Sequence, residues 1–213
     1  MKFYWIKTHW IVKKIFHNFI WDVSNDKKTV YLTFDDGPIP DITPWVLNEL
    51  KKHDVKATFF CIGDNIDKHP EIFKKVIADG HSLGNHTFNH LNGWKTPKNK
   101  YIENVKQCED VIYSHLKTHP EPKVFRPPFG KITNTQSKAI RKLGYKIIMW
   151  DVLSADFDLN ISKEECLKNV LSTVESGSII IFHDSKKAFK NLEFVLPKTL
   201  QYLKNNNFNC EIL

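Results

Sequence analysis

The feature that most restricts the fold is a regular alternation of short β-rich runs with amphipathic helical stretches, from residue 28 to the end of the 213-residue chain. Such alternation is typical of βα units, in which helices cover a sheet of parallel strands. Seven strands are predicted, over residues 28–34, 55–61, 81–86, 123–126, 145–151, 178–183 and 208–213. Seven parallel strands with helices outside favour a closed or nearly closed α/β barrel over an open sheet.

Helix-capping residues support this interpretation, because they fall between the predicted strands. Pro70 can open a helix that Gly80 closes, and Ser162 with Glu165 has the spacing of a capping box. Residues 98–117 carry apolar side chains at three- and four-residue intervals, which predicts a longer helix. Caps, periodicity and turns therefore agree on one order of elements.

Ionisable side chains gather where the predicted strands end. The candidates are Asp35, Asp36, His86, His90, Arg126, Asp151, Asp156 and His183. In parallel α/β folds, the loops at the carboxyl edge of the strands converge on one crevice, where ligands bind and chemistry occurs. The sequence therefore predicts that these side chains, although distant along the chain, share one site.

Two short segments supply the ligand types of a catalytic metal site. Asp35 and Asp36 follow the first predicted strand, and His86 and His90 stand four residues apart after the third. Two imidazoles and one carboxylate leave positions open for water and substrate, and they suit Zn²⁺. Co²⁺, Ni²⁺, Mn²⁺ and Fe²⁺ accept the same donors. The remaining carboxylate could take a proton from metal-bound water, whose pKa the metal lowers.

Five motifs resemble, in order, those of the polysaccharide deacetylases, carbohydrate esterase family four, with its nodulation-type chitooligosaccharide deacetylase homology domain. They are TFDDGP at 33–38, HTFNH at 86–90, RPPFG at 126–130, WDVLSADF at 150–157 and IFH at 181–183. An ordered set of five motifs is far more specific than any single motif, and the resemblance covers residues 28–213. It implies a distorted seven-stranded (β/α) barrel that removes acetyl groups from N-acetylated sugars.

The resemblance also implies a role for each matching residue. Asp35 would be the general base, and Arg126 would orient it. His183 would be the general acid that protonates the departing amine. The implied metal ligands are Asp36, His86 and His90.

Three carboxylates could hold the His183 imidazole. Alignment with the motifs favours Asp156, and Asp151 and Asp184 are the alternatives. A carboxylate in this place should raise the pKa of His183 and keep the ring protonated.

The remaining positions concern the acetyl group. A main-chain N–H near Phe129, next to Pro128, would stabilise the oxyanion. Phe129 stands where the family most often has Tyr, Phe157 where Trp is commonest and Ile181 where Leu is usual. Phe157 should reshape the apolar wall around the acetyl methyl. No ionisable group is lost, which argues against a pseudoenzyme.

The chain is expected to divide into an N-terminal amphipathic segment, residues 1–27, and a catalytic domain, residues 28–213. In a helical projection of residues 1–21, most apolar side chains fall opposite the lysines. Such a basic, aromatic helix could pack on its own domain or lie peripherally on an anionic membrane. No apolar run has the length of an export signal or a membrane span, which predicts a cytoplasmic protein, peripheral at the inner membrane face in the second case.

Composition narrows the partners. The 31 Lys and Arg exceed the 24 Asp and Glu by seven, but the excess is spread along the chain, so no nucleic-acid partner is predicted. The four cysteines lack metal or redox spacing and are expected to be free thiols.

The predicted protein is thus a metal-dependent hydrolase that deacetylates N-acetylated sugars in polysaccharides, oligosaccharides or lipid-linked form. Metal-bound water would attack, with Asp35 as base and His183 as acid. Two alternatives stay open. An iron-dependent oxygenase uses the same two-histidine, one-carboxylate ligand set. A non-catalytic carbohydrate-binding protein could retain a vestigial metal site.

Overall fold

The computed structural model describes residues 4–25, 27–116 and 121–213, and it confirms the predicted distorted (β/α) barrel. Within these residues the sheet has eight strands, ordered β5-β4-β3-β2-β1-β7-β6, with β8 beside the start of β1. All the strand pairs are parallel. The strands are β1 (Thr29–Asp35), β2 (Thr58–Cys61), β3 (Ser82–Asn85), β4 (Val124–Phe125), β5 (Lys146–Ile147), β6 (Val152–Leu153), β7 (Ile179–His183) and β8 (Asn209–Glu211).

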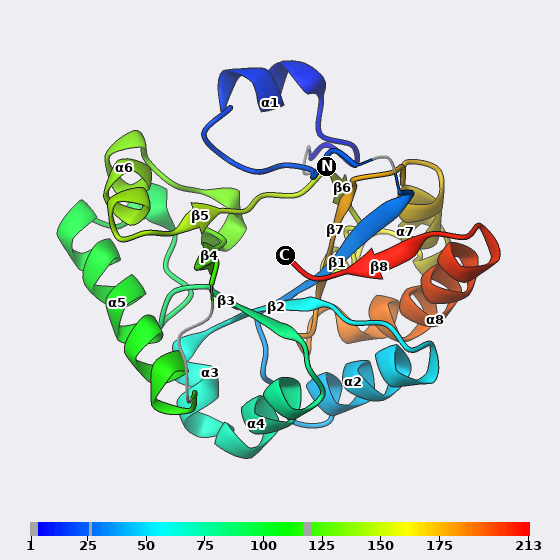
Figure 1. Ribbon diagram of the computed structural model, residues 1–213, viewed down its shortest axis with the longest axis horizontal. Coiled ribbons are helices and arrows are strands. Elements are labelled where there is room, and N and C mark those ends of the chain that lie inside the picture. Colours follow the sequence, from blue (N-terminus) through cyan, green and yellow to red (C-terminus); the bar gives the residue numbers. More distant parts are fainter. Residues whose placement is uncertain (1–3, 26, 117–120) are drawn as a thin grey trace.

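The helices surround this curled sheet (Figure 1). They are α1 (Trp10–Ile15), α2 (Ile42–Lys52), α3 (Gly63–Lys68), α4 (Pro70–Ala78), α5 (Lys98–Ser114), α6 (Asn134–Lys142), α7 (Lys163–Leu171) and α8 (Phe189–Asn205), with short 3-10 turns η1 (Gly93–Lys95) and η2 (Pro128–Gly130). The predicted helices that begin at Pro70 and within 98–117 are confirmed. The Ser162 side chain caps α7 by accepting from the Glu165 N–H at 3.0 Å.

Each predicted strand segment contains an observed strand. Within residues 145–151, however, the strand β5 covers only Lys146–Ile147, and a further strand, β6, follows this segment. The chain leaves the sheet after Ile147, because Ile148 forms a parallel bridge with Ile20. The Met149 N–H then donates to the Ile20 carbonyl at 2.7 Å. Ile148 and Met149 therefore pair with Ile20 of the N-terminal segment, and the predicted single strand is interrupted there.

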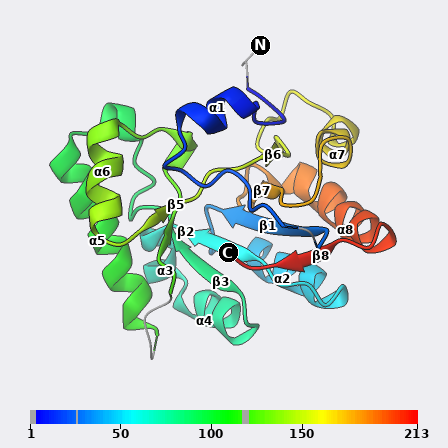
Figure 2. The ribbon, with the colours of Figure 1, turned by 45° about the horizontal axis from the view of Figure 1, so that its top comes forward.

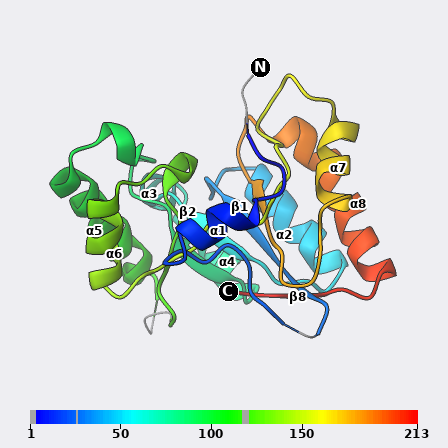
Figure 3. The same ribbon diagram turned by 90° about the horizontal axis from the view of Figure 1, so that it is seen from above.

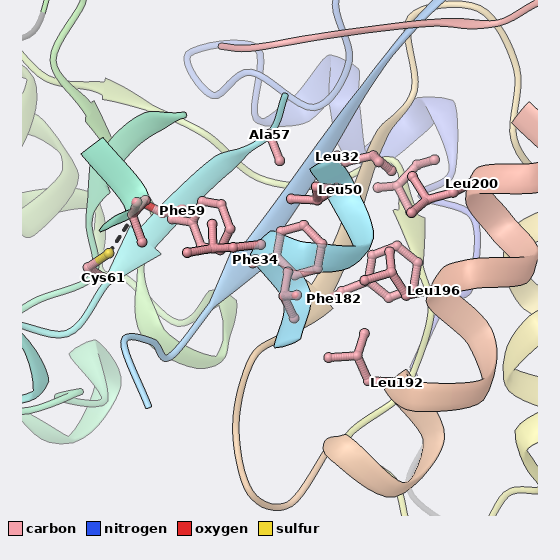
Figure 4. Packing of buried hydrophobic residues seen from close by; sticks show 14 of the residues in the cluster. Leu32, Phe34, Leu50, Ala57, Phe59, Cys61, Phe182, Leu192, Leu196 and Leu200 are labelled. Carbon is pink, nitrogen blue, oxygen red and sulfur yellow. Dashed lines mark hydrogen bonds between the residues drawn. The ribbon is translucent and has the colours of Figure 1, made fainter. Parts of the chain in front are cut away.

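The largest core cluster lies between β1, β2, β7 and the helices that cover them (Figure 4). Phe34 of β1 stacks on Phe59 of β2 and on Phe182 of β7, with ring centroids 5.1 and 5.8 Å apart. α8 presents Leu192 and Leu196 to the same cluster. Because β1 is buried on both faces and held from both sides, its last residue is rigidly placed.

The N-terminal segment joins β5 to β6, which do not pair with each other. The Ile20 N–H donates to Ile147 at 2.8 Å, and the Leu153 N–H donates to Ile6 at 2.8 Å. A helix therefore forms only over α1, whereas residues 6–8 bond to the backbone of residues 151–153. In Figures 1, 2 and 3, α1 lies between the α5–α6 side and the α7 side of the barrel. In the described chain, no helix has both the length and the apolar character needed to cross a membrane.

Candidate active site

The carboxyl edge of the sheet brings the predicted side chains together. Asp35 at the end of β1 is the register partner of His183 on β7, and Asn85 at the end of β3 is the partner of Phe125 on β4. The loops that follow these strands therefore start next to one another. The groups that meet here are Asp35, Asp36, His86, His90, Arg126, Asp156 and His183.

Asp36, His86 and His90 form a cluster in which one ligand atom of each lies within 4.8 Å of the others. Asp36 Oδ1 is 3.8 Å from His86 Nε2 and 3.3 Å from His90 Nε2. This carboxylate oxygen is buried and has no hydrogen-bond partner among the described residues. An unpaired buried oxygen beside two imidazole nitrogens fits a divalent cation.

Both histidines of this cluster favour the neutral form that ligates metals. Burial lowers the pKa of His86 well below its usual value, and burial also lowers the pKa of His90 although Asp36 opposes the shift. His86 Nδ1 lies 2.8 Å from the Arg126 carbonyl oxygen. Because a carbonyl only accepts, Nδ1 carries the proton and Nε2 is left to bind metal.

Asp35 has a different partner from its neighbour. Arg126 is fully buried, and its Nη1 donates to Asp35 Oδ1 and to Thr33 Oγ1, each at 2.7 Å. Its other nitrogens donate to the carbonyls of Ile148 and Met149. These hydrogen bonds hold the guanidinium in place, and it in turn fixes the Asp35 carboxylate. Asp35 Oδ2 lies 3.7 Å from Nε2 of His86, a member of the candidate metal cluster.

His183 pairs with Asp156 and with neither alternative carboxylate. The ring Nδ1 lies 2.8 Å from Asp156 Oδ1, and the His183 main-chain N–H donates to Asp156 Oδ2 at 2.7 Å. Burial disfavours the charged ring, but the Asp156 carboxylate outweighs burial and raises the pKa of His183 to about 9. His183 therefore carries a proton at neutral pH.

Asp151, one of the alternatives, faces the N-terminal segment. Its carboxylate binds Lys7 Nζ at 2.5 Å and Lys13 Nζ at 2.6 Å, and Ser178 Oγ donates to it at 2.6 Å. This buried carboxylate therefore ties the N-terminal segment to the barrel.

Asp184, the other alternative, holds the loop after β1. Its Oδ1 accepts from the Gly37 N–H at 3.0 Å and its Oδ2 from Thr43 Oγ1 at 2.5 Å. Its own N–H donates to the Asp35 carbonyl at 3.0 Å. Burial raises the pKa of Asp184 to about 8, although the hydroxyl of Thr43 opposes the shift. These bonds lie on both sides of Asp36 in sequence, so Asp184 positions the loop that carries this candidate ligand.

Backbone strain is concentrated around the site. Asp36, Thr87, His90, Phe129 and Ala155 all have positive φ angles between 53° and 85°, a region that residues other than glycine seldom adopt. Strain of this kind persists only where surrounding contacts impose it, and it is typical of functional sites. Hydrogen bonds constrain the backbone at two of these positions: Asn65 Nδ2 donates to the Asp36 carbonyl at 2.7 Å, and the Thr87 N–H donates to Asn85 Oδ1 at 2.9 Å.

Aromatic side chains flank the candidate site at two places, beside His90 and beside His183. The Phe129 ring is 57% exposed and its centroid lies 4.5 Å from that of His90, whereas Pro128 next to it is buried. Phe157 contacts the His183 ring edge-on at 5.1 Å. Tyr4 packs edge-on against Phe157 at 5.9 Å, so the N-terminal segment reaches the site.

Sequence reasoning missed Thr33, Tyr4 and the loop-holding function of Asp184. Thr33 precedes Asp35 by two residues, so both side chains project from the same face of β1, and the period of a strand could have revealed this. Asp184 directly follows His183, but its partners Gly37 and Thr43 are far away in sequence. No local signal predicts the contact of Tyr4.

The barrel and its charged carboxyl edge define an α/β domain with a candidate metal cluster, and sequence comparison identifies its family. The family model described as polysaccharide deacetylase matches residues 22–148. The chain belongs to the polysaccharide deacetylase family, as its motifs predicted.

Individual relatives agree with this assignment. The chain is 35% identical over 181 residues to a peptidoglycan-N-acetylglucosamine deacetylase of Bacillus cereus, covering 85% of this chain and 64% of that protein. It is 30% identical to a chitooligosaccharide deacetylase of Azorhizobium caulinodans, over 76% of each chain.

A solved structure extends the likeness to three dimensions. The crystal structure of a peptidoglycan N-acetylglucosamine deacetylase in complex with 4-naphthalen-1-yl-N-oxidanyl-benzamide superposes with a TM-score of 0.86 and 32% identity. It covers 92% of this chain and 91% of that one. The likeness therefore includes almost the whole barrel.

Proposed function

We propose that this protein is a metal-dependent hydrolase that removes acetyl groups from N-acetylated sugars. The observation that carries the proposal is the separation of two adjacent carboxylates. Asp36 faces His86 and His90, whereas Asp35 is bound by the buried Arg126. One carboxylate can therefore ligate a cation while the other accepts a proton.

Asp36, His86 and His90 would hold the cation. When bound, it supplies Lewis acidity, which lowers the pKa of water and polarises the acetyl carbonyl. Zn²⁺ suits two imidazoles and one carboxylate, and Co²⁺, Ni²⁺, Mn²⁺ and Fe²⁺ accept the same donors. The neutral histidines and the unpaired Asp36 oxygen support this assignment.

The other residues supply the proton transfers of amide hydrolysis. Asp35 accepts a proton from the attacking water as the water oxygen bonds to the acetyl carbon. The Phe129 main-chain N–H would donate to the carbonyl oxygen as negative charge develops there. His183, kept protonated by Asp156, gives its proton to the amide nitrogen as the C–N bond breaks, which yields acetate and a free amine.

The substrate class follows from what the relatives share. One relative is named for N-acetylglucosamine in peptidoglycan and the other for chitooligosaccharides, which are built from the same sugar. We infer that this chain acts on N-acetylglucosamine units of a glycan. Phe157, packed against His183, would contact the acetyl methyl.

Hydrolysis accounts for more of the site than the alternatives do. An oxygenase would use Asp36, His86 and His90 as metal ligands. It would give the His183–Asp156 pair no role in its chemistry. A vestigial site would not need a buried arginine on Asp35.

Acetate release tests the proposal. The protein, loaded with each divalent cation in turn, is incubated with chitooligosaccharides and with peptidoglycan fragments, in air and without oxygen. We expect acetate from at least one substrate under both atmospheres, and none above background from folded His183→Ala. Absence of acetate with every cation and substrate, or wild-type turnover by His183→Ala, would contradict the proposal.

A further inference from the structure

The outward face of α1 is an apolar surface with basic residues, and nothing in the described chain covers it. We call the exposed side chains of Trp10, Ile11, Lys14 and Ile15 the α1 surface. In the described residues nine large hydrophobic side chains are exposed, and five of them lie within residues 5–16. This concentration distinguishes the segment from the isolated exposed apolar residues that most proteins carry.

The segment is fixed to the barrel by its other side, which settles which way α1 faces. Lys13 points inward and binds Asp22 at 2.5 Å and the buried Asp151 at 2.6 Å. On an α-helix with 100° between residues, Lys14 and Ile11 lie opposite the inward side that Lys13 and Val12 share. Trp10, Ile11 and Ile15 therefore lie on the outward half of α1, and Figure 3 shows α1 with no helix or strand in front of it.

Charge complementarity identifies the partner. Residues 1–21 contain no Asp or Glu, and Lys14 is exposed within the surface. Arg141 of α6 adds a cation beside the turn that follows α1, where its Nη1 donates to Asn18 Oδ1 at 3.1 Å. The nearest acid in sequence, Asp22, is paired with Lys13. Tryptophan and aliphatic side chains beside basic groups are the composition that binds the interface of an anionic bilayer.

We propose that the α1 surface docks this protein on an anionic lipid bilayer, with Trp10, Ile11 and Ile15 inserted at headgroup level and Lys14 beside the phosphates. The proposal does not depend on the deacetylase assignment, because no residue of the α1 surface belongs to the candidate metal cluster or to the Asp35–Arg126 and His183–Asp156 pairs. Docking would hold the catalytic domain at a membrane surface by a peripheral contact.

Co-sedimentation with vesicles tests this. The full chain is mixed with vesicles of phosphatidylcholine alone or with added phosphatidylglycerol. We expect it to sediment with the anionic vesicles only, and less so at high salt because exposed charges are screened. Trp10→Ser/Ile15→Ser should weaken binding by roughly tenfold or more, and Lys14→Glu by about tenfold.

Trp94→Ser is the matched control, because Trp94 is 66% exposed on η1, outside the N-terminal segment, against 63% for Trp10. It should bind like the parent. Parent protein that stays in the supernatant with anionic vesicles, or equal loss in Trp94→Ser and the double variant, would overturn the proposal. The proposal would also be overturned if the parent does not bind vesicles but forms a dimer in light scattering, and the double variant does not form this dimer. Acetate release from soluble oligosaccharides should be unchanged in the double variant, which separates docking from catalysis.

Discussion

Asp35 and His183 are register partners on β1 and β7, yet each is bound by a different charged residue. Arg126 donates to Asp35, and Asp156 binds the His183 ring. Adjacent strands thus place a carboxylate held by a cation next to an imidazole held by an anion. This arrangement suits a proton acceptor and a proton donor on the two sides of one bond.

Removing the arginine should damage both the fold and the activity. Arg126→Met leaves the buried Asp35 carboxylate without its cation, and breaking a buried pair in this way costs about 3–5 kcal/mol. Chemical denaturation should show this loss, and acetate release should fall to background. The double variant Arg126→Met/Asp35→Asn should regain part of the stability without activity. A single variant as stable as the parent would contradict the role of Arg126.

The pH dependence should depend on Asp156. A general acid must be protonated, so activity should fall as pH rises through the pKa of His183, about 9. Asp156→Asn removes the carboxylate that raises the pKa of His183, so burial should lower this pKa. The alkaline limb of kcat against pH should therefore move to lower pH. An alkaline limb that stays in place would separate His183 from the acid role.

The same shift links to stability. Because the pKa of His183 is raised on folding from 6.5 to about 9, its contribution is fully present below pH 6.5 and is lost as pH rises through 9. Unfolding followed against pH in parent and Asp156→Asn should show that the difference between them narrows over this window. A constant difference would show that ionisation of His183 is not its source.

The loop after β1 should be sensitive at Gly37. A Cβ there would lie 2.0 Å from Asp184 Oδ2, so Gly37→Ala must displace the carboxylate that holds the loop of Asp36. Metal affinity measured by titration calorimetry should fall about 10–100-fold, as for other residues that support ligands. Thr43→Ala should also weaken binding, whereas Thr43→Ser keeps the hydroxyl and should bind like the parent. Parental affinity in Gly37→Ala would contradict the positioning role of Asp184.

Tyr4 should affect turnover although it lies outside the predicted catalytic domain. Its ring supports Phe157, and its hydroxyl donates to Asp158 at 3.1 Å. Tyr4→Ala should lower kcat severalfold, because Phe157 loses the packing that holds it against His183, while Tyr4→Phe keeps the ring and should change little. Equal kcat in the parent and Tyr4→Ala would show that the N-terminal segment does not support the site.

Local sequence predicted the site better than it predicted the barrel wall. Asp36, His86 and His90 follow strands whose pattern is clear, so their convergence follows from parallel topology. The break after Ile147 depends on hydrogen bonds with Ile20, and local propensity carries no information about such a distant partner. The six-residue α3 is too short to produce a period, so it went unpredicted.

The N-terminal segment shows the same limit. Its periodicity predicted a helix over much of residues 1–21, of which residues 1–3 lie outside the described chain. The structure forms α1 alone, because Ile6 and Thr8 make backbone bonds with Leu153 and Asp151. The boundary between residues 27 and 28 stays a prediction, and the contacts of Tyr4 show that the two parts pack together.

The central claim is that the adjacent carboxylates of Asp35 and Asp36 divide metal binding from proton transfer. It is tested most directly by measuring bound metal and acetate release in the same preparations of Asp35→Asn and Asp36→Asn. We expect Asp35→Asn to retain the metal content of the parent. Its turnover should fall on the order of a thousandfold, which is the usual contribution of a general base. Asp36→Asn should lose both metal and turnover. Equal metal loss in the two variants, or turnover by metal-loaded Asp35→Asn near that of the parent, would contradict the account.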